Sequence, residues 1–282
     1  MAIELVAKFL PYVDEMFATE SKKSLLTNRD FDWTGAHSVR IYKITTSTMN
    51  DYDRAGTGSN WSFYGPVAPL SATTQEMTLT RDRSFTFTLD RLDQDETLMQ
   101  LAAASALARQ VREVVIPEID AYVYNVMCAN AGYKPAAKAL TAANIYTEIL
   151  AASEALDNAE VPETGRVLVL NPAVYTLLKK SKEVAMETDI GNELRLKGVI
   201  AMLDGMTVLK VPAVRLPKDF GFLVAHPCAT AAPTKLEDYV THDNPPGISG
   251  ALVEGRICYD AFVLDNKAQA LYYQAQPAAA GE

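Results

Sequence analysis

Hydrophobic and polar positions alternate in two stretches of the chain that flank a long polar segment. Val39 and Ile41 alternate with polar residues in the first stretch. The apolar positions of the second stretch are Met77, Leu79, Phe85, Phe87 and Leu89. This period of two is typical of strands that bury one face. The segment between them is rich in Gly, Ser, Thr, Asn and Pro, and so long a loop usually has a function. We therefore expect an extended β-hairpin loop over residues 35–92.

A helical pattern follows the hairpin. Apolar residues recur at spacings of three and four from about residue 95 to residue 130, which predicts one long helix. Asp93 and Glu96 have the spacing of a capping box just before it. Pro117 lies inside the pattern and lacks a backbone donor, so we expect a kink near Glu113 or a helix in two pieces.

Helices and strands are mixed between residues 140 and 235. Thr141 is expected to cap a helix whose apolar face includes Leu150. The continuous apolar run in Arg166 to Leu170 predicts a buried strand, and Asn171 followed by Pro172 predicts the start of the next helix. Further strands are expected at residues 206–212 and 220–225. This mixture indicates a compact α+β domain.

The two ends of the chain differ in character. Residues 1–34 form an amphipathic, charge-mixed arm that has to dock either on its own domain or on another surface. Residues 236–274 return to strands, with an Asn-Pro-Pro-Gly turn at 244–247 and alternating apolar residues over 256–273. The last residues, 275–282, are expected to be a short flexible tail.

Composition narrows the classes of protein that fit. The chain has 282 residues, a net charge of −9 and a pI of about 5.0, which argues against a protein whose main task is gripping nucleic acid. The same charge is compatible with a container that encloses nucleic acid. Three cysteines far apart in sequence predict no disulfide framework and a reducing compartment: Cys128, Cys228 and Cys258. We expect neither a signal peptide nor a membrane span, because the first residues lack the basic and apolar regions and no apolar run is long enough.

The residues with the most reactive chemistry form no recognisable site. His226 and Cys228 could hold a metal, but zinc needs three or four ligands, so His226 is expected simply to end a strand. His242 beside Asp243 lacks a nucleophile motif, and the glycines of the polar segment match no phosphate-binding pattern. We therefore expect no catalytic, cofactor or metal site, and the chain is not expected to be an enzyme.

Charged residues of both signs are dense in and after the polar segment. They form either a solvated strand face or a set of pairs with another subunit, and paired charges set register and specificity more than affinity. The residues that we expect to contact a neighbouring subunit are Asp53, Arg54, Arg81, Asp82 and Arg83.

Several short motifs, in order, resemble one family. GA-x-SV-x-I-x-KI from Gly35, DYDR at 51–54, LTRDRSFTF at 79–87 and LDRLDQDET at 89–97 resemble the extended-loop region of tailed-phage major capsid proteins with the HK97-type fold. VVIPEIDAY at 114–122 is similar to part of the family's long spine helix. YDAFVLDNK and the closing LYY resemble its last strands.

The resemblance implies a complete domain plan. The fold class would be α+β, an HK97-type capsid fold. Its parts would be an N-terminal arm (1–34) that crosses onto a neighbour, an extended loop (35–92), the spine helix of a peripheral domain (93–139), an axial domain (140–235), C-terminal strands that return to the peripheral domain (236–274) and the tail (275–282). The DYDR and RDR positions would lie on the extended loop, which favours subunit contact for their charges.

The resemblance also implies a function. The chain would be a major capsid protein that self-assembles through pentamers and hexamers into the icosahedral head of a tailed bacteriophage and encloses its double-stranded DNA. It would be part of the virion and be assembled in the bacterial cytoplasm, with a separate scaffolding protein, a portal and head-completion proteins as partners. One branch of the fold cross-links subunits through Lys and Asn with the help of a Glu, but no local motif marks such a trio here. The alternatives are an encapsulin-like nanocompartment shell and a small soluble α+β hydrolase.

Overall fold

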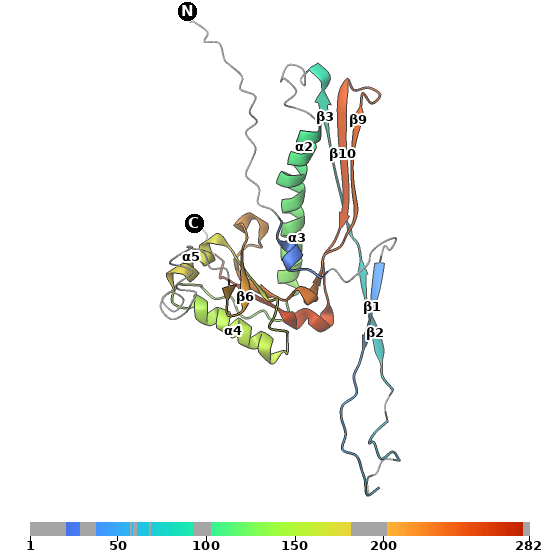
Figure 1. Cartoon of the computed structure of the whole chain (residues 1–282), viewed down its shortest axis with the longest axis vertical. Helices are drawn as coiled ribbons and strands as arrows, with labels where there is room; N and C mark the ends of the chain where they lie inside the picture. Colours follow the sequence, from blue (N-terminus) through green and yellow to red (C-terminus); the bar gives the residue numbers. More distant parts are fainter. Residues whose placement is uncertain are drawn as a thin grey trace, which may run out of the picture. The chain divides into compact units, whose positions relative to one another are not determined.

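The computed structural model describes residues 21–28, 38–56, 58, 61–67, 69–92, 103–181 and 202–278 (Figure 1). The chain divides into two compact units. The larger consists of Met1–Asp32 and Thr80–Glu282 and is called the body; the smaller, Trp33–Leu79, is called the loop unit.

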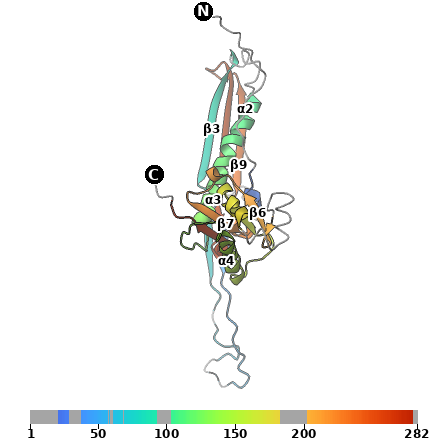
Figure 2. The same ribbon diagram turned by 90° about the vertical axis from the view of Figure 1, so that its left-hand side faces the viewer.

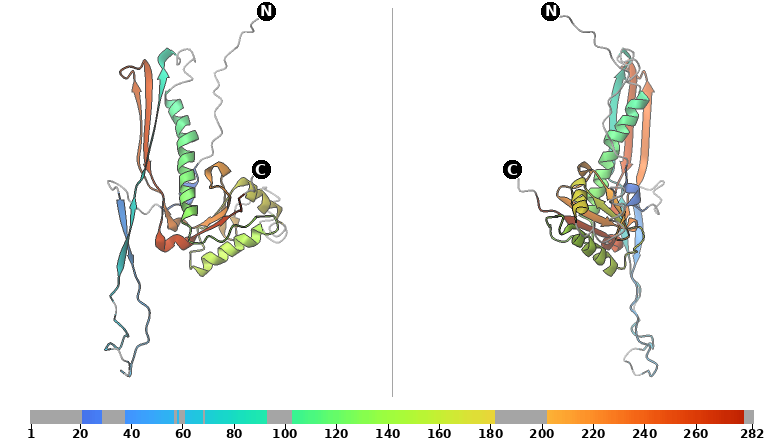
Figure 3. Two further views of the ribbon diagram at one scale, coloured as in Figure 1. Left: turned by 180° about the vertical axis from the view of Figure 1, so that it is seen from behind. Right: turned by 60° about the vertical axis from the view of Figure 1, so that its left-hand side comes forward.

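A two-stranded hairpin is the regular part of the loop unit. Strand β1 (Ser38–Ile44) pairs antiparallel with β2 (Ala72–Thr78), in a register that places Ser38 opposite Thr78 and Ile44 opposite Ala72. The Thr45 N–H donates to the Ser71 carbonyl at 3.0 Å and continues the ladder past the strands. The expected hairpin on either side of the polar segment is therefore confirmed (Figure 3).

The second alternating stretch does not belong entirely to this hairpin. Strand β3 (Arg81–Asp90) pairs with β10 (Gly250–Tyr259), and β10 also pairs with β9 (Thr234–Asp243), all antiparallel. The structure thus places the end of the loop at Leu79 rather than at residue 92.

The packing of one aromatic ring explains why β3 joins this sheet. Phe85 lies opposite Gly255, and a Cβ added to Gly255 would come within 2.3 Å of the Phe85 ring. Without that Cβ the ring lies close over β10, and its centroid is 6.0 Å from that of Tyr239 on β9. The glycine therefore lets one side chain of β3 pack across both of the other strands.

The predicted long helix is confirmed over the residues that the structure describes. It runs as α2 (Ala103–Gln110), a π-helical segment η2 (Val111–Val115) and α3 (Ile116–Ala129). The irregularity expected near Glu113 is this π-helical turn directly before Pro117, because a proline supplies no N–H to the preceding turn. The capping box at Asp93 and Glu96 lies outside the described residues. Figure 2 shows α2 beside the β3–β10–β9 sheet.

A five-stranded sheet forms the centre of the rest of the body. Its strand order is β12-β7-β4-β6-β5. The strands are β4 (Val167–Leu170), β5 (Met202–Leu203), β6 (Met206–Lys210), β7 (Phe220–Ala225) and β12 (Leu271–Ala275). Helices α4 (Ile145–Asn158) and α5 (Pro172–Lys180) complete this part. The strands expected at 166–170, 206–212 and 220–225 are confirmed.

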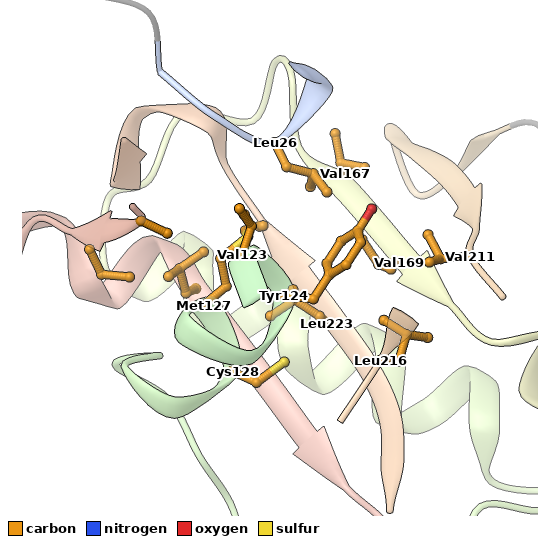
Figure 4. Packing of buried hydrophobic residues seen from close by; sticks show 14 of the residues in the cluster. Leu26, Val123, Tyr124, Met127, Cys128, Val167, Val169, Val211, Leu216 and Leu223 are labelled. Carbon is orange, nitrogen blue, oxygen red and sulfur yellow. The ribbon is translucent and has the colours of Figure 1, made fainter. Parts of the chain in front are cut away.

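Strand β4 shows why a continuous apolar run forms a strand here. Val167 and Val169 point into a hydrophobic cluster that contains Val123, Tyr124 and Met127 of α3 (Figure 4). Successive strand residues point to opposite faces. Leu168 and Leu170 accordingly join a second cluster with residues of α4 and α5. The sheet is therefore covered by helices on both faces.

Two helix starts were predicted, with different outcomes. The side-chain oxygen of Asn171 accepts from the Val174 N–H at 2.7 Å, so this residue caps α5 as expected. The cap expected at Thr141 is wrong. Helix α4 begins at Ile145 after Asn144, whose side-chain oxygen accepts from the Thr141 N–H and closes a turn before the helix. Leu150, expected on the apolar face, is exposed.

The C-terminal region contains more than strands. The Asn-Pro-Pro-Gly turn joins β9 to β10, with Asn244 and Gly247 at positive φ, as such a turn requires. The alternating stretch at 256–273 is not continuous strand. It contains the end of β10, the short β11 (Phe262–Val263), which pairs with β8 (Thr230–Ala231), the 3₁₀ turn η5 (Asp265–Ala270) and the start of β12. Two further 3₁₀ turns are η3 (Ala213–Arg215) and η4 (Pro227–Ala229).

The described part of the N-terminal arm, residues 21–28 with the 3₁₀ turn η1 (Lys23–Leu25), packs on the body of its own chain. Leu26 is 0% exposed and lies in the cluster around Tyr124 (Figure 4). The Ser21 hydroxyl donates to Asp120 Oδ1 at 2.6 Å, and Arg215 binds Asp120 Oδ2 at 2.8 Å. A buried ion pair therefore joins α3 to η3, and a hydrogen bond from Ser21 joins the arm to the same carboxylate.

Candidate subunit interface

Large apolar side chains are exposed along the loop unit. Trp61 is 87% exposed and Met49 is 97% exposed. Among the described residues of this unit, the exposed large apolar side chains are Tyr42, Ile44, Met49, Tyr52, Trp61, Phe63, Tyr64, Val67 and Leu70. Exposed apolar side chains gathered on one segment are typical of an interaction surface. The loop unit is thus the part of the described chain with the clearest character of an interface.

The Asp53 carboxylate binds backbone groups within the tip of the loop, residues 46–70. Its Oδ1 accepts from the Gly56 N–H at 2.9 Å and its Oδ2 from the Gly58 N–H at 2.5 Å. Its own N–H donates to the Phe63 carbonyl at 2.9 Å, which joins the two sides of the tip. Gly56 has φ +67°, a conformation that favours glycine.

The aromatic residues of the tip pack against each other and remain exposed. The Tyr52 ring meets Tyr64 edge-on at 5.0 Å between centroids and lies 6.2 Å from Phe63. Arg54, next to Asp53, is exposed and forms no ion pair with any residue that the structure describes. The tip therefore presents aromatic rings beside a cation.

The three other charged residues of the predicted interface lie on β3 and bind their own chain. Arg256 on β10 holds Asp82 through two hydrogen bonds, at 3.0 and 2.5 Å, and this contact lowers the pKa of Asp82. Arg83 Nε binds Glu118 Oε1 on α3 at 2.8 Å. The Arg81 guanidinium lies 4.6 Å above the Tyr122 ring. These contacts join β3 to β10 and to the helix, yet the side chains of Asp82 and Arg83 stay 48% and 58% exposed.

The structure thus separates the five predicted residues between two units. Asp53 and Arg54 belong to the loop unit, and Arg81, Asp82 and Arg83 belong to the body. Reasoning from charge missed the aromatic residues Trp61, Phe63 and Tyr64. The signal was available in the sequence WSFY, an aromatic cluster in a polar segment that has no core of its own to bury it.

The histidines have structural contacts. His226 follows β7 directly, which confirms its position at a strand end. Its Nδ1 accepts from the Cys228 N–H at 3.2 Å, so Nε2 carries the proton and donates to the Thr164 carbonyl at 3.1 Å. Burial lowers the pKa of His226. His242 lies 3.4 Å from Glu254 across the β9–β10 pair rather than using Asp243.

The described residues offer neither a metal site nor a membrane-spanning helix. They contain no group of three or more His, Cys, Asp or Glu side chains placed to hold a metal ion. Within the same ranges no helix has the length and apolar character that crossing a bilayer requires.

Comparison with known proteins identifies the family. The phage capsid protein family matches residues 72–273. No curated protein matches. Among solved structures, Mycobacterium phage Che8 is similar with a TM-score of 0.75 and 19% identity over 97% of this chain and 96% of that chain. The capsid of Cyanophage P-SCSP1u gives 0.77 and 15% over 97% and 93%, and the mature capsid of bacteriophage PhiM1 gives 0.73 and 14% over 96% and 91%.

At these low identities the TM-scores show a shared fold, and the family model matches most of the chain. The chain therefore belongs to the phage capsid protein family: it is a tailed-phage major capsid protein with the HK97-type fold, a structural protein of the virion whose copies form the head shell.

Proposed function

We propose that the loop unit is the segment by which one subunit binds its neighbour within the pentamers and hexamers of the shell. The exposure of its apolar side chains carries this proposal. Full burial of one large apolar side chain contributes about 1.5–3 kcal/mol. A contact that covers a few of them supplies useful affinity, and repetition over a closed shell multiplies many modest contacts.

The charged residues are proposed to set the register of that contact. Arg54 is the first candidate, because it is exposed beside the aromatic rings and has no ion-pair partner among the described residues. Arg81, Asp82 and Arg83 are proposed to meet a neighbour through their exposed portions, in addition to the partners that they have on their own chain. Asp53 acts indirectly in this scheme, by holding the tip in shape.

The remaining parts are proposed to follow the family plan. Residues 140–235 form the axial domain around the fivefold and sixfold centres, a division that the separate hydrophobic cluster of α4, α5 and the sheet supports. The spine helix and the β9–β10 part of residues 236–274 form the peripheral domain, whereas β12 pairs with β7 in the sheet of the axial domain. The arm reaches a neighbour. The shell encloses double-stranded DNA without gripping it, in keeping with the net charge of −9. A separate scaffolding protein, a portal and head-completion proteins would act with it in the bacterial cytoplasm.

Replacing the tip of the loop tests the central claim. Thr45 and Ser71 are already hydrogen-bonded, so residues 46–70 can be replaced by an Asn-Gly turn that closes the hairpin directly. The variant should keep the melting temperature of the body, because the loop unit is a separate unit, and should form no shells by electron microscopy. Shells of normal yield, or an unfolded body, would contradict the proposal.

A matched pair of point variants tests the role of Arg54. Arg54→Gln should lower shell yield, whereas Arg40→Gln, which removes the same charge from the same unit, should not. Arg40 pairs with Glu76 on its own hairpin at 3.2 Å, and exposed pairs of this kind contribute roughly 0–1 kcal/mol. Neither change should alter the melting temperature of the unassembled subunit appreciably. Equal shell yields for the two variants would remove Arg54 from the interface.

A further inference from the structure

Asp260, in the turn after β10, is a buried carboxylate with four hydrogen-bond donors. Its Oδ2 accepts from both the N–H and the hydroxyl of Thr80, each at 2.8 Å. Its Oδ1 accepts from the Tyr122 hydroxyl at 2.7 Å and from the Ala261 N–H at 2.8 Å. Asp260 is only 3% exposed, and its own N–H donates to the Pro233 carbonyl.

Thr80, which binds Asp260, lies at the boundary between the loop unit and the body. Leu79 is the last residue of the loop unit and Thr80 is the first residue of the body after it. Both hydrogen-bond donors of that first residue, its N–H and its hydroxyl, bind one carboxylate. The next residue, Arg81, is held as well, with its guanidinium over the ring of the same Tyr122 that donates to Asp260.

We propose that Asp260 is a positioning residue that anchors the root of the extended loop, so that movement of the loop begins at Leu79 and stops before β3. The anchor joins three elements that are distant in sequence: the start of β3, helix α3 and the end of β10. A carboxylate suits this place because it accepts every one of the four donors and donates none.

The anchor is important for assembly if the loop unit binds a neighbouring subunit, and this inference rests on that proposed function. A loop that must meet a neighbour with its tip needs a fixed departure point, since a small rotation at the root becomes a large displacement at the tip. Burial and the hydrogen bond to Asp260 both raise the pKa of Tyr122, which keeps its hydroxyl protonated as a donor.

Amide hydrogen exchange on the full-length Asp260→Ala variant tests the anchor. Alanine removes both acceptor oxygens, so the N–H and the hydroxyl of Thr80 both lose their partner. We expect exchange in peptides spanning residues 78–82 to accelerate by roughly tenfold or more, a factor in keeping with loss of one charge-assisted hydrogen bond. Peptides from residues 85–90 and 118–128 should be unchanged, and shell yield should fall.

Tyr122→Phe is the matched control. It removes one donor to the same carboxylate and leaves both Thr80 contacts in place, so exchange at residues 78–82 and shell yield should stay close to those of the unmodified chain. If Asp260→Ala does not fold, Thr80→Val takes its place, since Thr80 is exposed and the change removes only the hydroxyl. The N–H of residue 80 keeps its bond to Asp260, so a smaller acceleration, still confined to residues 78–82, and a lower shell yield are then expected.

Three results would overturn the inference. The first is an unchanged exchange rate at residues 78–82, and the second is an exchange rate that rises equally across all of β3, which would mean that Asp260 contributes only to general stability. The third is a faster exchange rate confined to residues 78–82 together with a normal yield of shells. These outcomes are distinct from a failure of the proposed function. If the loop is not the assembly segment, shells survive replacement of residues 46–70, whereas the exchange measurement on the subunit still shows whether Thr80 is anchored.

Discussion

The buried ion pair between Asp120 on α3 and Arg215 in η3 permits a quantitative prediction about the body. The Asp120 and Arg215 side chains are 2% and 7% exposed, and the oxygen and nitrogen are 2.8 Å apart. Asp120→Asn would remove the carboxylate that binds the buried guanidinium of Arg215. Removing one partner of a buried pair costs about 3–5 kcal/mol, and we expect the lower end because the Asn oxygen can still accept one hydrogen bond.

A second ion pair from the same helix is the matched control. Glu118 binds Arg83 at the same 2.8 Å, but these side chains are 42% and 58% exposed. Glu118→Gln is chemically the same change, and an exposed pair contributes only about 0–1 kcal/mol because solvent screens it. The two variants therefore differ mainly in burial.

Urea unfolding of unassembled subunits, followed by circular dichroism, measures both changes. The difference in free energy follows from the shift in midpoint at a common slope. Asp120→Asn should lower stability by at least about 2 kcal/mol more than Glu118→Gln. Variants within about 1 kcal/mol of each other would refute the argument that burial decides the worth of these pairs.

Two further predictions concern the body. Gly221→Ala should destabilise the subunit by more than Gly205→Ala, because the new Cβ at residue 221 would lie 2.5 Å from the Gln274 carbonyl oxygen. A Cβ at residue 205 would have no atom within 4 Å, so Gly205→Ala costs only the backbone strain of φ +71°, about 1–2 kcal/mol. Calorimetry measures both changes, and equal losses of stability would contradict this prediction. His226 has a pKa below its usual value because of burial, so its contribution to stability is complete above pH of about 6.5 and is lost as pH falls through the lowered pKa. Between pH 7 and pH 5 the melting temperature should therefore fall more in the unmodified chain than in His226→Gln, and parallel curves would rule this out.

The elements that the sequence predicted well are those in which local chemistry decides the outcome. The apolar run of β4 has to be buried on both faces, and Asn171 followed by Pro172 supplies a cap and a fixed φ to start α5. Pro117 disturbs its helix because the missing donor belongs to the residue itself. The short motifs likewise identify the family without any knowledge of tertiary contacts.

Other features depend on which segments meet. Nothing local distinguishes a β3 that continues the β1–β2 hairpin from one that pairs with β10, since the alternation is the same in both. The charge of Arg83 reads as a free surface group until the fold brings Glu118 beside it.

The sequence by itself therefore determined the family, most of the secondary structure and the presence of an extended loop. The tertiary structure decided where that loop ends, which charges already have partners and that the aromatic tip remains exposed. The physical reason is range: caps, turns and apolar periodicity act within a few residues, whereas an acceptor such as Asp260 acquires its role from Thr80, which is 180 residues away along the chain.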